Sequence, residues 1–116
     1  MSAVLSEICL DVNDLERMAA FWSAALELPV ALEDGVAEMV LPSGLSFLLL
    51  PVPEPRTVKA RLHLDLSPRG CDQAEEVVRL EALGARRADV GQGEVSWVVL
   101  ADPEGNEFCV LAGRRD

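Results

Sequence analysis

The sequence contains no tyrosine, and only two tryptophans and three phenylalanines stand among its 116 residues. Half of the residues are nevertheless hydrophobic, so a core must be built mainly from leucine, valine and alanine. This apolar content argues against intrinsic disorder, which is typical of chains with too few apolar residues to form a core. A chain of this length predicts one compact domain, because two independent cores would be hard to stabilise at this size.

Basic residues are scarce. Ten lysines and arginines stand against twenty aspartates and glutamates, and the formal net charge is −10. This balance repels phosphate backbones and anionic lipid surfaces, so neither nucleic acid nor a membrane is expected as a partner. The apolar stretch from Val36 to Val52 is interrupted by Pro42, Gly44 and Pro51, and it does not predict a membrane span.

The cysteines are few and odd in number, and no short spacing typical of a metal site joins Cys9, Cys71 and Cys109. They are better interpreted as free thiols in a reducing compartment than as a disulfide framework. Glu7 and Asp11 interrupt the first apolar stretch, so no signal peptide is predicted. These features favour a cytoplasmic protein.

The first half of the sequence predicts one strand, one helix and three shorter strands. Apolar residues alternate with others from Leu5 to Val12, a period of two that indicates a strand with one face on the core. Apolar residues then recur at helical spacing and predict a helix from about Asp14 to Glu27, with Asn13 or Asp14 as its N-cap and Pro29 at its end. Strands are expected next around Val30 to Leu32, Val36 to Leu41 and Leu45 to Leu50.

The second half repeats this order after a proline-rich connector, Pro51 to Pro55, whose prolines remove donors from any sheet. A strand is expected from Arg61 to Ser67, followed by a helix that Asp72 caps and Gly84 ends. The last strands are expected from Ala85 to Val90, Val95 to Leu100 and Asn106 to Leu111, with Asp102 to Gly105 as a turn. The order predicts a single α+β domain of two βαβββ modules, module one at 1–52 and module two at 58–116.

Several stretches that follow this order also resemble a known family. They are Asp14-Leu15-Glu16-Arg17, Phe21-Trp22, Leu26-Glu27-Leu28-Pro29, Arg61 to Leu66, Leu80 to Ala85 and Asp102 to Cys109. Together they resemble the glyoxalase/bleomycin resistance protein/dioxygenase superfamily, also called vicinal oxygen chelate proteins, and within it a glyoxalase-like subfamily. The resemblance implies two curved sheets that form one cleft around a small molecule. It does not select a reaction, since the superfamily includes isomerases, dioxygenases, epimerases, thiol transferases and drug-sequestering proteins.

The resemblance also implies four positions for metal ligands, at the start of the first strand and within the last strand of each module. Here these positions are Glu7, Leu48, His63 and Cys109. Leu48 cannot bind an ion, and a Cys109 thiolate suits zinc better than magnesium or manganese. Two conventional ligands lose much of the chelate advantage, so we predict a protein without a metal or other cofactor. If a metal does bind, we expect Glu7, His63 and Cys109 to hold it.

His63 is the only histidine and the best candidate for a general acid or base, with Glu7 as a second catalytic group. The alternative is a pocket or core histidine that is hydrogen-bonded to a neighbour. Asp65 shares the strand face of His63, so it either orients the imidazole, binds a polar ligand or is simply an acid at a wet strand end.

Glu7, Cys9 and Asp11 alternate on one face of the first predicted strand. If this face lines the cleft, as the resemblance implies, the pocket is acidic and suits a cationic or hydroxyl-rich ligand. Solvation of an edge strand explains the same residues equally well. The residues proposed to bind a ligand are Asp65, Cys109, Cys9, Asp11, Leu48 and Trp22.

Two of these candidates have a more ordinary explanation. Cys109 is more typical of an inert buried thiol than of a nucleophile, because activation requires a cation nearby. Trp22 and Trp97 are expected to pack between helix and sheet, although either ring could instead stack on a ligand.

The sequence thus predicts a glyoxalase-like protein that binds a small organic molecule, with a lyase or isomerase reaction by proton transfer at His63 as the catalytic hypothesis. One alternative is a non-catalytic protein that sequesters a drug or metabolite. Another is an interaction platform whose cleft is filled by side chains. A homodimer is expected, because pairing would cover exposed sheet edges.

Overall fold

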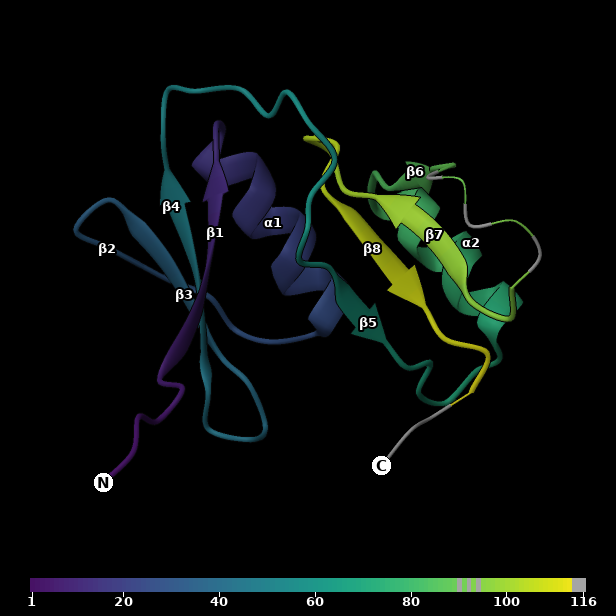
Figure 1. The fold of residues 1–116 in the computed structure, drawn as a ribbon, viewed down its shortest axis with the longest axis horizontal. Helices are drawn as coiled ribbons and strands as arrows, with labels where there is room; N and C mark the ends of the chain where they lie inside the picture. The colour runs from purple at the N-terminus through teal and green to yellow at the C-terminus, as the bar shows by residue number, and fades with distance from the viewer. Residues whose placement is uncertain (90, 92, 94, 114–116) are drawn as a thin grey trace. The chain divides into compact units, whose positions relative to one another are not determined.

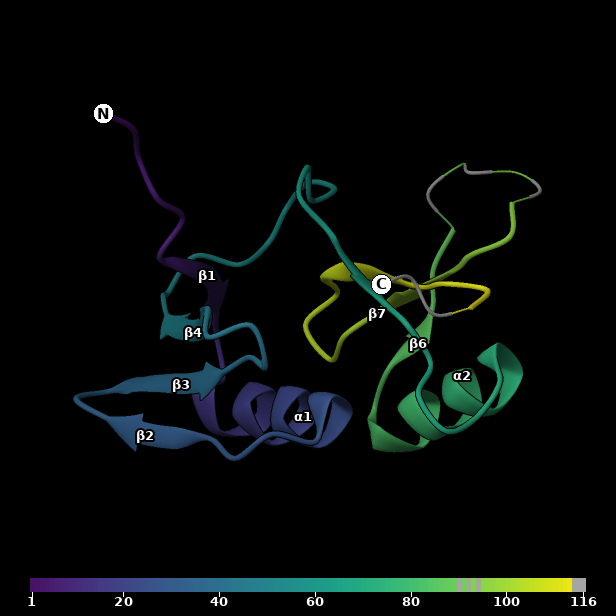
Figure 2. The same cartoon turned by 90° about the horizontal axis from the view of Figure 1, so that it is seen from below.

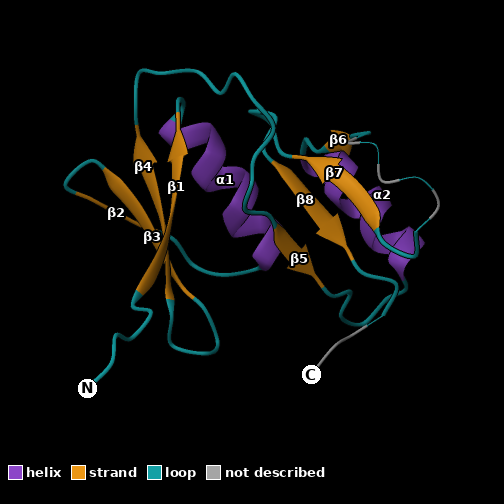
Figure 3. Cartoon of the chain, in the orientation of Figure 1, coloured by secondary structure: helices purple, strands orange, loops and turns teal. Residues whose placement is uncertain are grey.

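The computed structural model describes residues 1–89, 91, 93 and 95–113. The chain separates into two compact units, Met1–Pro55 and Arg56–Asp116. Over these described residues, each unit contains one helix and one four-stranded sheet, and the elements follow the order strand, helix and three strands (Figure 1; Figure 3). The predicted α+β fold with two βαβββ modules is therefore confirmed.

The two sheets share one topology. The first unit consists of β1 (Glu7–Val12), α1 (Leu15–Leu26), β2 (Ala31–Glu33), β3 (Val36–Val40) and β4 (Ser46–Pro51). The second consists of β5 (Leu64–Leu66), α2 (Gln73–Leu83), β6 (Arg86–Arg87), β7 (Val98–Ala101) and β8 (Glu107–Val110). The strand orders are β1-β4-β3-β2 and β5-β8-β7-β6. In each sheet the first strand pairs in parallel with the last, and the remaining neighbours are antiparallel.

The core of the first unit lies between α1 and one face of its sheet. The Asp14 side chain caps α1 by accepting a hydrogen bond from the backbone N–H of Arg17 at 3.1 Å. The buried Trp22 ring meets Phe21 and Phe47 edge-on, with centroids 5.2 and 5.7 Å away. Phe47 is in register with Ile8 of β1, so the odd-numbered residues of β1 face away from α1.

The second unit is built in the same way. Asp72 and Glu75 form a capping box at the start of α2, and Gly84 ends the helix at a φ of 123°. Leu80 of α2 is fully buried, as are Leu100 and Val110 of the sheet. Figure 2 shows that each helix lies on one side of the sheet of its own unit. The face of each sheet opposite its helix therefore carries the side chains that do not belong to this helix–sheet core.

The turn before β8 is formed as expected. Asp102 is fully buried, and its Oδ1 accepts hydrogen bonds from the backbone N–H groups of Glu104 and Asn106. Gly105 donates its own N–H to the Asp102 carbonyl and has a φ of 90°, a conformation that glycine adopts without strain. The Asp102 carboxylate therefore stabilises this turn.

Several strands of the second unit are shorter than the sequence predicts. The strand expected from Arg61 to Ser67 is limited to β5, because only Leu64–Leu66 pairs with β8. The last expected residue of the next strand, Val90, lies outside the described residues, and β6 comprises Arg86–Arg87.

The core interpretation of Trp97 is wrong, since its side chain is 41% exposed. Its strand was expected from Val95, but β7 begins at Val98, so Trp97 precedes the sheet instead of packing within it. Neither helix combines the length and the apolar character that a membrane span requires, over the residues that the structure describes.

Candidate functional site

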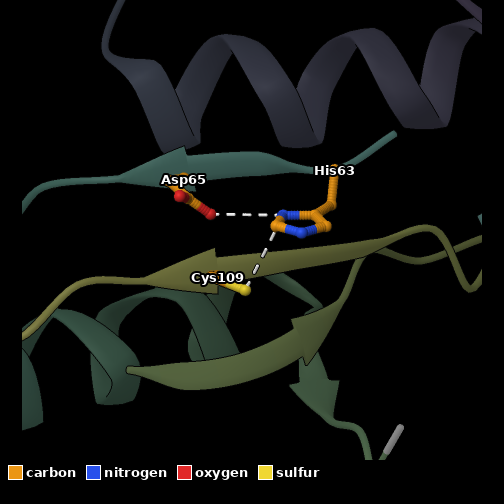
Figure 4. A group of neighbouring side chains, drawn as sticks. All are labelled: His63, Asp65 and Cys109. Carbon is orange, nitrogen blue, oxygen red and sulfur yellow. Dashed lines mark hydrogen bonds and ion pairs between the residues drawn. The ribbon is translucent and has the colours of Figure 1, made fainter. Parts of the chain in front are cut away.

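His63, Asp65 and Cys109 form a cluster of three side chains in the second unit (Figure 4). Asp65 of β5 lies directly opposite Cys109 of β8 in the parallel register. Their neighbours Leu64 and Phe108 point to the helix side, so Asp65 and Cys109 share the face opposite α2. His63 lies immediately before β5, not within it as predicted, and its ring still turns toward the other two side chains.

The contacts within the cluster define the state of the imidazole. His63 Nδ1 lies 3.2 Å from Asp65 Oδ1 and 3.9 Å from Cys109 Sγ. A carboxylate only accepts hydrogen bonds, so we assign the proton of the neutral ring to Nδ1. The lone pair then resides on Nε2. Because the His63 and Asp65 side chains are 47% and 45% exposed, solvent and small molecules can reach this pair.

Cys109 differs from its two neighbours because it is only 5% exposed. Burial raises the pKa of its thiol, and the Asp65 carboxylate raises it further through its negative charge and by accepting the thiol hydrogen bond. Lys59 opposes this effect less strongly. The thiol is therefore protonated at neutral pH, which favours the inert interpretation over a nucleophile.

The candidates of the first unit lie together on one face of its sheet. Glu7, Cys9 and Asp11 are exposed on β1, on the face opposite α1. Leu48 of β4 is directly opposite Cys9 and is half-buried on the same face. The acidic and polar surface expected for β1 is thus present within this unit. The catalytic pairing of Glu7 with His63 stays a prediction.

Trp22 lies on the other side of that sheet. Its side chain is 1% exposed, and Phe21 and Phe47 enclose its ring. The structure therefore supports the core interpretation of Trp22 over the ligand-binding one.

Glu107 is not among the site residues predicted from the sequence. Its side chain is only 9% exposed, and it forms an ion pair with Arg56. Glu107 precedes Cys109 by two residues, and strand alternation places both on the face opposite α2. An acidic residue at the start of an otherwise apolar strand was a signal that could have identified it.

The comparisons with known proteins agree with this fold. A family model described as glyoxalase-like domain matches residues 7–111. The chain therefore belongs to the glyoxalase-like domain family. A comparison with curated proteins gave no match.

Several solved structures have the same fold. A glyoxalase/bleomycin resistance protein/dioxygenase family enzyme from Burkholderia phytofirmans PsJN has a TM-score of 0.71 at 18% identity, with 93% of this chain and 97% of that chain covered. The fosfomycin resistance protein FosX from Mesorhizobium loti has a TM-score of 0.73 at 18% identity, covering 98% and 95%. FosX from Listeria monocytogenes, an E126Q variant in complex with Mn(II) and 1S,2S-dihydroxypropylphosphonic acid, has a TM-score of 0.74 at 22% identity, covering 98% and 93%.

The side chains of this cluster also carry atoms that can bind a metal ion. His63, Asp65 and Cys109 offer one nitrogen, one oxygen and one sulfur atom within 4.8 Å of one another. Such a mixed set fits zinc, whereas manganese prefers oxygen ligands. Of the expected ligands, His63 and Cys109 are brought together, and Asp65 joins them as the third. A metal at this place must displace the Cys109 proton.

Proposed function

We propose that the protein binds a small organic molecule at the face of the second unit that carries His63, and that His63 transfers a proton to or from this molecule. The contact of 3.2 Å between His63 Nδ1 and Asp65 Oδ1 carries the proposal. It leaves a basic nitrogen on a half-exposed ring whose orientation a carboxylate fixes. This places the chain among candidates for a lyase or isomerase.

The proposed reaction uses the two ends of the imidazole differently. Nε2 accepts a proton from an acidic C–H or O–H group of the bound molecule, while Asp65 accepts the hydrogen bond from Nδ1 and stabilises the imidazolium that forms. Returning the proton to another atom completes an isomerisation, and returning it to a leaving group completes an elimination. A divalent ion bound by the cluster would polarise an oxygen of the same molecule.

Residues around His63 have supporting roles in this proposal. The protonated Cys109 thiol lines the site next to the imidazole. Asp65 also accepts hydrogen bonds from polar groups of the ligand. Glu7 is proposed as a second catalytic group, and Cys9, Asp11 and Leu48 as ligand-binding positions. Each of these assignments predicts a loss of ligand affinity when the side chain is truncated to alanine.

The single histidine makes the proposal directly testable. The imidazole resonances of the native protein are followed by NMR while hydroxyketones, organic acids and phosphonates, including fosfomycin, are added. A compound that shifts these resonances is then incubated in D2O, and deuterium uptake at its acidic carbon is measured. We expect His63→Gln to reduce the exchange rate by about 10²- to 10⁴-fold, the contribution typical of a positioned general base. Undiminished exchange in this variant, with Glu81→Gln as a control, contradicts the proposal.

A non-catalytic binding protein is the second candidate, and the identities of Leu48 and Cys109 favour it. Neither side chain supplies the hard ligand atom that an oxygen-coordinating ion prefers. This alternative predicts that a bound compound shows no deuterium uptake and no turnover. It also predicts that His63→Gln changes affinity alone.

A further inference from the structure

Glu107 has partners that the proposed proton transfer does not use. One carboxylate oxygen, Oε2, forms an ion pair with Arg56. The other, Oε1, accepts the backbone N–H of Ala60 at 3.0 Å. Both partners belong to the segment that leads into β5, and Arg56 is 51 residues away in the sequence.

Few hydrogen bonds join this segment to the sheet in the part of the chain that the structure describes. Residues 56–63 lie outside the sheet, since pairing with β8 begins at Leu64. Between Arg56 and Leu62, within the part of the chain that the structure describes, the hydrogen bonds that reach the sheet both end on Glu107. Ala60 is three residues before His63. Glu107 therefore holds the segment that leads to His63 through two hydrogen bonds.

Glu107 is unsuited to act on a ligand itself. Its side chain is only 9% exposed, and both oxygens are already engaged. A buried carboxylate with a charged partner and a backbone donor is held in one orientation, because losing either partner would leave a buried charge unsatisfied. These features indicate a structural support and argue against a proton acceptor.

We propose that Glu107 is a positioning residue for His63. By binding Arg56 and Ala60 at once, it fixes the segment before β5 against the start of β8, and it thereby sets where the imidazole meets Asp65. The importance of this role for catalysis rests on the proposed function of His63. The positioning of His63 by Glu107 does not depend on that function. Glu107 is on β8, two residues before Cys109. The same strand therefore supplies the residue that positions His63 and a residue that lines the site.

The test uses the full chain and compares Glu107→Gln with Glu81→Gln, which removes an exposed carboxylate of α2 in the same unit. Two quantities are measured: hydrogen exchange of the Ala60 amide, and the ¹⁵N shifts of the His63 ring, which report the tautomer. We expect Glu107→Gln to speed Ala60 exchange by about tenfold, as for a segment that opens locally, and to reduce the preference for the Nδ1–H tautomer. Amides of α2 and β7 should exchange as in the native protein.

Arg56→Ala is the second variant, and it guards against a general loss of folding because Arg56 is at the partly exposed end of the ion pair. It should accelerate Ala60 exchange in the same direction and to a smaller extent, since the Ala60 bond to Glu107 remains. Native Ala60 exchange and an unchanged His63 tautomer in both variants would overturn the proposal.

Asp65→Asn separates this inference from the proposed function. It should alter the His63 tautomer without changing exchange at Ala60, because Asp65 contacts the ring and not the segment. If Asp65→Asn leaves the tautomer unchanged, the proposed orientation of the base is wrong. The effect of Glu107 on Ala60 exchange stands independently of that result.

Discussion

Replacing Asp65 with asparagine should make the Cys109 thiol more reactive. In the native protein, burial and the Asp65 carboxylate both raise the pKa of this thiol. A thiol at its ordinary pKa of about 8.5 is roughly 3% thiolate at pH 7, and the fraction is smaller when the pKa is raised. Removing the carboxylate leaves burial in place, so the substitution tests only the electrostatic part.

The magnitude follows from the geometry of the cluster. The ligand atoms of Asp65 and Cys109 lie within 4.8 Å of each other. At this distance a negative charge destabilises a thiolate by about 0.9 kcal/mol even at the dielectric constant of water. Because Asp65 is half-exposed, solvent screens its charge, and the interaction does not reach the larger value of a dry interior. The thiolate fraction, and with it the alkylation rate, should therefore rise by about fourfold or more.

The assay is alkylation by iodoacetamide at pH 7 to 8, with each cysteine followed by peptide mass spectrometry. Cys9 is exposed on the other unit and serves as an internal control whose rate should not change. In the native protein Cys9 should react before the buried Cys109. An unchanged or slower Cys109 rate in Asp65→Asn would refute the electrostatic account of the cluster.

Three further results are expected. The purified protein should contain no stoichiometric metal, and EDTA should not shift its Tm, since only a ligand bound to the native state does so; zinc that is lost in His63→Ala would contradict this. Light scattering should give a dimer mass, and a monomer at high micromolar concentration would exclude it. Hydrogen bonds from Arg79 hold the Glu76 pKa below its ordinary value. This pair therefore stabilises the fold at any pH above the pKa that Glu76 has in the unfolded chain. The stabilisation is lost as the pH falls through the lower pKa that Glu76 has in the folded protein. Arg79→Ala should therefore have a lower Tm than the native protein at neutral pH. In acid, the difference between the two Tm values should be smaller.

Features that depend on nearby residues were predictable from the sequence. The Asp72 cap needs only Glu75, and Gly84 ends its helix through its own backbone freedom. The element order follows from hydrophobic periodicity in the same way, because each strand and helix carries its own pattern. The alternation of Glu7 and Cys9 on β1 likewise identified one face of the first sheet.

Features that depend on distant residues were not predictable with the same accuracy. The length of β5 is limited by its pairing with β8, more than forty residues later, and the pattern from Arg61 onward does not contain that limit. Trp97 precedes a strand that begins only where pairing with β8 allows. Arg56 and Glu107 are far apart in the sequence, and only the fold brings them into contact.

The cluster around His63 illustrates how register changes the chemistry of a site. The resemblance implies a metal ligand at the position of Cys109 in the last strand, and the soft thiolate there alone suggested a weakened site. In the folded unit, Asp65 lies directly opposite Cys109, and its carboxylate contacts His63 from the neighbouring strand. A carboxylate is thus still adjacent to the imidazole, but it also raises the pKa of the thiol beneath. This combination favours a neutral, oriented base over a thiolate ligand, because the same Asp65 charge that orients His63 opposes ionisation of Cys109.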